Sequence, residues 1–101
     1  MTKYIFDNNN PYWGDDRHYN YFFLLCKMNY FNDCLRCYGF LPRYEVLKEL
    51  GFDVSVEDLK YGWVLGDGDN FVDFGIGDQM PRKTGRKRKR YVLRLNDIKF
   101  D

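Results

Sequence analysis

The sequence predicts an α+β fold, in which a long N-terminal helix and a shorter helix pack on a three-stranded antiparallel sheet. Three observations predict this class. Apolar residues recur at helical spacing through residues 16–38 and again through residues 42–50, and apolar and polar residues alternate in short segments after residue 62. With 101 residues, of which 20% are aromatic, the chain is expected to form a single domain, residues 1–101, around one hydrophobic core.

The first helix is predicted over residues 16–38. It follows an N-terminal arm, residues 1–15, in which the run DNNNPYWG favours turns. Asp15 and Asp16 place negative charge at the positive end of the helix, and Gly39 is typical of the residue that follows a helix. At 100° per residue, one side of this helix is apolar and is predicted to face the core. Its members are Tyr21, Leu24, Leu25, Met28, Phe31, Leu35 and Tyr38.

A second apolar stripe runs along another side of the same helix. Its members are Tyr19, Phe23, Cys26, Tyr30, Cys34 and Cys37. Two explanations are open. Either the aromatic residues of the N-terminal arm cover the stripe, or it is an interface for a partner protein or for a second copy of the chain in a homodimer. In the second case the expected interface residues are Tyr19, Phe23, Tyr30 and Cys34.

Two shorter helical segments are predicted next. Pro42 suits the start of a helix that runs to Gly51, because its missing N–H needs no partner in the first turn. The spacing of Ser55 and Asp58 is typical of a capping box at the start of one short helical turn.

Three strands are predicted after these helices. Residues 63–65 and 71–76 are expected to form a hairpin, because GDGDN between them supplies residues that tolerate positive φ. Residues 91–96 alternate again and are the expected third strand of the sheet. The predicted core positions of this part are Trp63, Val72, Phe74, Ile76, Leu93 and Leu95.

Positive charge is concentrated near the C-terminus. Residues 1–80 carry seven Lys/Arg against thirteen Asp/Glu, a net charge of −6, whereas residues 81–101 carry nine against two, a net charge of +7. Because like charges repel one another, such a cluster is typical of a segment that binds a polyanion, although a solvated loop without a partner is the alternative. Residues 80–90 are expected to form this basic loop, with the cations Arg82, Lys83, Arg86, Lys87, Arg88, Lys89 and Arg90.

These seven cations are the candidate residues for binding a partner or a nucleic acid. Arginine suits phosphate because it can donate two parallel hydrogen bonds to it. Tyr91 follows the cations directly and is expected to stack on a base.

The sequence lacks the motifs of common catalytic, metal and cofactor sites. Cys34 and Cys37 form a CxxC motif, but a structural zinc site needs a second pair of ligands, and the one histidine, His18, lies on a different side of the helix. Residues 67–73 do not fit a calcium-binding loop, because apolar residues occupy its fifth and sixth positions. We therefore expect no metal, no cofactor and no enzyme activity.

Three segments resemble a known group of proteins. They are FLPRYEVLKELGF, GWVLGDGDNFVDFGI and YVLRLND, which together span residues 40–98. In this order they resemble small proteins of unassigned function encoded by phages and mobile elements of Gram-positive bacteria, although the basic segment and the LRLND ending depart from that pattern. Some phage proteins of similar size are anti-CRISPR proteins, so the resemblance implies an accessory phage function.

Two functions are expected from these observations. The first is a phage-encoded inhibitor of a host defence nuclease, an anti-CRISPR protein that binds Cas9 and interferes with its guide RNA. The second is a small nucleic-acid-binding accessory or regulatory protein. The sequence has no apolar run of about eighteen residues and no signal peptide, so we expect no membrane association and a place in the cytoplasm of the bacterial host.

Overall fold

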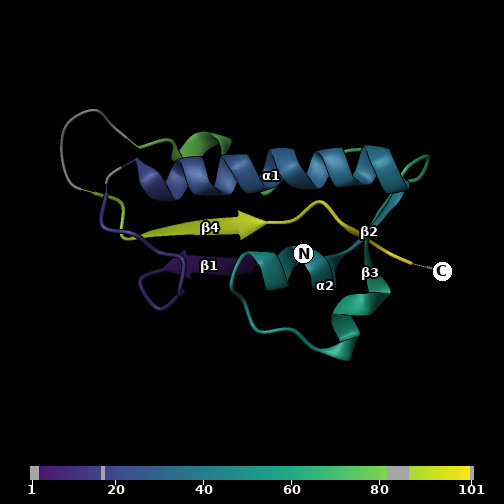
Figure 1. The fold of residues 1–101 in the computed structure, drawn as a ribbon, viewed down its shortest axis with the longest axis horizontal. Helices are drawn as coiled ribbons and strands as arrows, with labels where there is room; N and C mark the ends of the chain where they lie inside the picture. The colour runs from purple at the N-terminus through teal and green to yellow at the C-terminus, as the bar shows by residue number, and fades with distance from the viewer. Residues whose placement is uncertain (1–2, 17, 82–86, 101) are drawn as a thin grey trace.

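The computed structural model describes residues 3–16, 18–81 and 87–100, and within them the α+β class is confirmed. The helices are α1 (Tyr19–Tyr38) and α2 (Arg43–Glu49). The strands are β1 (Lys3–Asp7), β2 (Phe40–Pro42), β3 (Tyr61–Val64), β4 (Arg90–Arg94) and β5 (Ile98–Lys99). Two short 3-10 helices are η1 (Val56–Lys60) and η2 (Gly77–Gln79). Figure 1 shows α1 running along the longest axis of the structure.

The strands form two small antiparallel sheets. β1 pairs with β4, so that Phe6 lies opposite Tyr91 and Tyr4 lies opposite Leu93. β3 lies between β2 and β5 in a three-stranded sheet. Figure 1 shows β1 and β4 lying along the axis of α1 and pointing in opposite directions, whereas β2 and β3 lie near the C-terminal end of that helix.

The predicted hairpin of residues 63–65 and 71–76 is wrong. β3 is present, but residues 71–76 form an irregular segment between α1 and the end of β4. The three segments predicted as one sheet do not form a ladder with one another, although the Arg94 N–H donates to the Phe74 carbonyl at 2.8 Å and the Asn96 N–H to the Asp73 carbonyl at 3.3 Å. β3 pairs instead with β2 and β5, and β4 pairs with β1 of the N-terminal arm, for which no strand was predicted.

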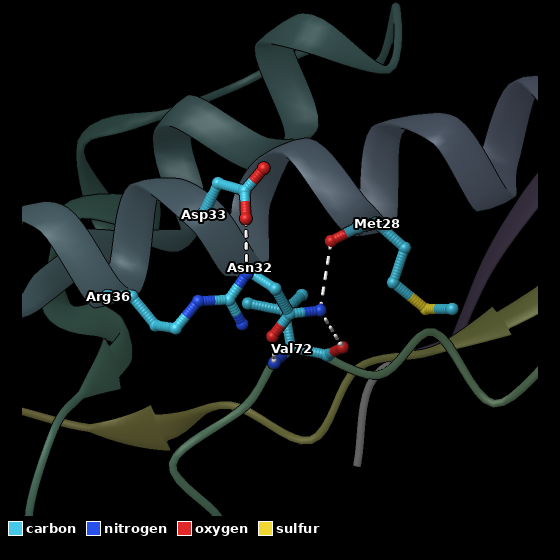
Figure 2. Close-up of polar contacts among 5 residues, drawn as sticks. All are labelled: Met28, Asn32, Asp33, Arg36 and Val72. Atoms are coloured by element: carbon cyan, nitrogen blue, oxygen red, sulfur yellow. Dashed lines mark hydrogen bonds and ion pairs between the residues drawn. The ribbon is translucent and has the colours of Figure 1, made fainter.

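Side-chain amides bond to backbone groups of the irregular segment, as a neighbouring strand would. Asn32 on α1 accepts a hydrogen bond from the Val72 N–H at 2.7 Å and donates one to the Val72 carbonyl at 3.1 Å (Figure 2). Its amide nitrogen also donates to the Met28 carbonyl at 2.9 Å. Farther along the segment, Asn96 accepts a hydrogen bond from the Asp73 N–H at 2.8 Å. Because an amide side chain both donates and accepts, it can satisfy backbone groups as a paired strand would.

The hydrophobic core is built from both helices, both sheets and the irregular segment. Six predicted core positions are confirmed. None of them is more than 3% exposed, and they are Trp63, Val72, Phe74, Ile76, Leu93 and Leu95. The predicted α1 residues that are buried are Tyr21, Leu24, Phe31 and Leu35, with Leu25 and Met28 partly buried against them. Tyr38 is 80% exposed, so its predicted place in the core is wrong, because α1 ends there and Gly39 turns the chain with a φ of 76°.

Two of the acidic residues predicted at helix starts, Asp16 and Asp58, accept hydrogen bonds from backbone N–H groups there. α1 begins at Tyr19 rather than at residue 16, and Asp16 accepts hydrogen bonds from the N–H groups of His18 at 2.9 Å and Tyr19 at 3.2 Å. These hydrogen bonds hold the pKa of Asp16 below its ordinary value, so its carboxylate is ionised at the positive end of the helix. At η1, the Ser55 N–H donates to the Asp58 carboxylate at 3.0 Å.

Candidate functional site

Four consecutive cations lead into β4, which begins at the last of them, and their side chains are exposed. They are Lys87, Arg88, Lys89 and Arg90, and we name them the basic ridge. None of the four forms an ion pair with a carboxylate of the described residues. The predicted cations that lie outside the described residues are Arg82, Lys83 and Arg86.

The basic ridge lines one side of a groove of about 1040 Å³. The N-terminal arm and the start of α1 line the other side. Asn20 ties these two segments together, because its side chain accepts a hydrogen bond from the Gly14 N–H at 2.9 Å and donates one to the Gly14 carbonyl at 2.8 Å. Lys87 links the ridge to the arm through a hydrogen bond from its ammonium group to the Asp15 carbonyl. The structure thus brings together two segments that are far apart in the sequence.

The groove contains charges of both signs. Asp7, Asp15 and Asp16 line it together with the basic ridge. Because Asp16 is ionised, an anion inside the groove would meet carboxylates as well as cations. A long polyanion therefore gains most by contacting the outer, solvent-facing side of the ridge.

Tyr91 lies beneath the basic ridge. Its ring is 1% exposed and contacts Tyr21 and Trp13, with ring centroids 5.9 and 6.2 Å apart. The Arg88 guanidinium covers it at 5.4 Å from the ring centroid. Tyr91 is therefore not exposed for stacking on a base, contrary to the prediction, because strand alternation turns its side chain towards Phe6 and the core. Burial also raises the pKa of Tyr91.

The N-terminal arm covers only part of the second apolar stripe of α1. Phe23 is half-buried under it and stacks on Phe6 and Tyr12, with centroids 5.5 Å apart in each pair. Tyr19 and Tyr30 are exposed. One of the two explanations, coverage by the arm, therefore applies to Phe23, and the rest of the stripe remains available to a partner.

The remaining residues on this side of α1 differ in exposure. Cys34, an expected interface residue, is half-buried. Phe22 was not selected from the sequence, yet it is exposed. It lies about 60° around the helix from Tyr19, so the same helical periodicity could have found it. Cys26 and Cys37 are exposed free thiols, and the described residues contain no group of three metal-ligating side chains.

Comparison with known proteins identifies a family for this chain. A family model matches residues 2–97. The chain belongs to DUF6353, a family of unknown function. No curated protein and no solved structure matches it. The family description states neither a phage origin nor an activity, so it does not decide between the two expected functions.

This DUF6353 member has a buried ionic cluster that was not predicted. Arg43 donates to Asp58 at 2.9 Å and to Asp97 at 3.3 Å, and its guanidinium lies 4.3 Å from the Tyr61 ring centroid. Burial raises the pKa of Asp97, against the opposing effect of the Arg43 charge. The cluster links α2, η1 and the segment before β5, so its role is structural. Its members lie far apart in the sequence, so no local sequence pattern predicts the cluster.

Among residues 3–16, 18–81 and 87–100, no helix has the length and apolar character needed to cross a bilayer.

Proposed function

We propose that this member of DUF6353 is a phage-encoded inhibitor of a host defence nuclease, an anti-CRISPR protein that binds Cas9 and interferes with its guide RNA. In this proposal it acts by binding alone, without catalysis or a cofactor, in the cytoplasm of the bacterial host. The resemblance of residues 40–98 to small phage proteins supports the biological setting. The basic ridge supports the kind of partner.

The basic ridge is the observation that carries the proposal. Its cations are consecutive, exposed and without ion pairs to described carboxylates, so a polyanion need not displace a carboxylate from them. Arginine binds phosphate through paired hydrogen bonds, and lysine binds it as a point charge. Four contacts to single-stranded RNA would give a slope of about −3 in a plot of log affinity against log salt concentration.

The charge of the remaining chain fits a complex with a protein that itself binds nucleic acid. Residues 1–80 carry a net charge of −6. Cas9 holds its guide–target duplex in a positively charged channel. The acidic part of the chain would be attracted to that channel while the basic ridge contacts the RNA backbone. An entirely basic protein would bind the RNA but would be repelled by the channel.

The second candidate is a small nucleic-acid-binding accessory or regulatory protein. One observation favours it, namely that Trp13 lines the same groove as the basic ridge, so an aromatic ring and several cations lie close together. Recognition of the DNA major groove by α1 is disfavoured. This helix carries only Lys27 and Arg36 as cations, and both already pair with carboxylates.

A Cas9 cleavage assay tests the proposal. The protein is added at increasing concentration to Cas9, guide RNA and target DNA, and the cleaved fraction is measured at several salt concentrations. The test variant changes the basic ridge to glutamine, by Lys87→Gln, Arg88→Gln, Lys89→Gln and Arg90→Gln. The matched control removes the same charge from four other exposed positions, by Lys3→Gln, Lys48→Gln, Lys60→Gln and Lys99→Gln.

We expect the wild type and the control to inhibit cleavage and the basic-ridge variant to lose most of this inhibition. Wild-type potency should also fall as salt concentration rises. Equal inhibition by both variants would contradict the role of the ridge. If no protein affects Cas9 while the wild type binds free RNA, the second candidate function replaces the first.

A further inference from the structure

We infer that the exposed side of α1 is the interface of an antiparallel homodimer, in which the α1 helices of two copies pack against each other. This inference is independent of the proposed inhibition of Cas9. It is based on the exposure of the helix, on the spacing of its apolar residues and on its charges.

The exposed side of α1 has an aromatic character that is unusual for a free surface. We define the α1 face as Tyr19, Phe22, Cys26, Tyr30 and Cys37, all of which are exposed. At 100° per residue they lie within about 80° of one another, on the side of the helix opposite the buried Leu24 and Leu35. Tyr19, Phe22 and Tyr30 are 46%, 56% and 53% exposed. Contiguous apolar surface of this kind marks interaction sites.

The spacing of these residues matches a second copy in the opposite direction. Tyr19, Cys26, Tyr30 and Cys37 follow one another at intervals of seven, four and seven residues, which is the repeat of a coiled-coil seam. This pattern is symmetric about Met28. In an antiparallel pair centred there, Tyr19 lies opposite the partner's Cys37, and Cys26 lies opposite the partner's Tyr30. Each of these four apolar residues therefore meets an apolar residue.

Charge selects the antiparallel arrangement over the parallel one. Asp33 lies on the same side of α1 and is exposed. A parallel pair would place it directly against the partner's Asp33 and would align the two helix dipoles. In the antiparallel pair these two carboxylates are about 15 Å apart along the axis, at 1.5 Å per residue. Each can also retain its ion pair with Arg36 of the same copy.

The area available is typical of a weak, transient interface, below the roughly 1,200–2,000 Å² of stable ones. A fully exposed aromatic side chain presents about 200 Å², so the three aromatic residues of the α1 face present roughly 300 Å² in each copy. The two cysteines and the flanking polar side chains increase this to about 500 Å² per copy, or about 1,000 Å² for the pair. We therefore infer a reversible dimer whose population depends on protein concentration.

Dimerisation would also determine where the two basic ridges lie. The ridge is next to the N-terminal end of α1, because Asn20 lines the same groove. α1 contains 20 residues and is therefore about 30 Å long. An antiparallel pair would carry one basic ridge at each of its two ends.

The oligomeric state of the full chain tests the inference. Sedimentation velocity over a concentration series should show a monomer–dimer equilibrium for the wild type. Tyr30→Glu places a charge at the centre of the interface and should raise the dimer Kd by about 100-fold or more. Tyr38→Glu is the matched control, because Tyr38 is exposed but lies outside the α1 face, and it should keep the wild-type Kd. Circular dichroism should show that both variants retain the wild-type helix content.

A disulfide experiment tests the direction of the helices. In a Cys34→Ser, Cys37→Ser background, Tyr30→Cys should form a disulfide-linked dimer with the partner's Cys26 under mild oxidation, and adding Cys26→Ser should abolish it. A parallel pair would instead cross-link through Cys26 without the Tyr30→Cys change. A wild type that remains monomeric at its highest soluble concentration would overturn the inference, and so would a Tyr30→Glu variant that dimerises as tightly as the wild type.

Discussion

Replacement of Asn32 by alanine should strongly destabilise the fold, although the side chain is polar and lies on a helix. Asn32 pairs with both backbone groups of Val72, at 2.7 and 3.1 Å (Figure 2). Val72 belongs to the irregular segment that carries Phe74 and Ile76 into the core. Alanine would leave the N–H and the carbonyl of Val72 without their side-chain partner at a partly buried site.

The magnitude follows from the hydrogen bonds lost. A buried backbone group without a partner costs about 1–3 kcal/mol, and the carbonyl is expected to cost less than the N–H because carbonyl groups tolerate incomplete hydrogen bonding better. We expect the free energy of unfolding to fall by about 2–4 kcal/mol. For a domain of this size, about 1 kcal/mol corresponds to about 4–8 °C in Tm, so the expected decrease is roughly 10–25 °C.

A thermal melt followed by circular dichroism measures this effect, with Asn29→Ala as the control. Asn29 is an exposed asparagine on the same helix, so the gain in helix propensity on replacement by alanine is similar in both variants. The difference between their Tm values therefore isolates the contacts of Asn32. Equal Tm values would refute the reasoning. Asn32→Asp should also be destabilised near neutral pH and should recover partly in acid, where its protonated carboxyl group can donate to Val72.

Two other substitutions have defined outcomes. Phe74→Ala removes a ring that is fully buried against Phe31, so the free energy of unfolding should fall by about 3–5 kcal/mol, whereas Phe71→Ala at an exposed position nearby should change it little in the same urea titration. Burial raises the pKa of Asp97 in the folded state above its ordinary value of 3.8. The stability that this group contributes is therefore fully present below pH 3.8 and is lost as pH rises through the folded-state pKa. Asp97→Asn should therefore gain stability relative to the wild type between about pH 3 and about pH 7, and a constant difference across this range would contradict the assigned effect of burial.

The sequence alone was sufficient to predict the helices and the alternation of burial. The apolar spacing in α1 and the buried positions Val72, Phe74 and Ile76 are local patterns, because helical and extended backbone each impose a fixed period on neighbouring residues. The exposure of the basic ridge could also be predicted, since consecutive charged side chains are rarely buried.

Only the tertiary structure decided how these segments pair. The sequence favoured a hairpin between residues 63–65 and 71–76, but Asn32, from a distant helix, occupies the hydrogen-bonding position of the partner strand. Likewise β1 and β4 come from opposite ends of the chain, and no local pattern encodes their pairing. The same holds for Arg43 with Asp58 and Asp97, and for the groove between the N-terminal arm and the basic ridge. These contacts join segments that only the fold of the whole chain brings together. A local window of sequence does not contain that information.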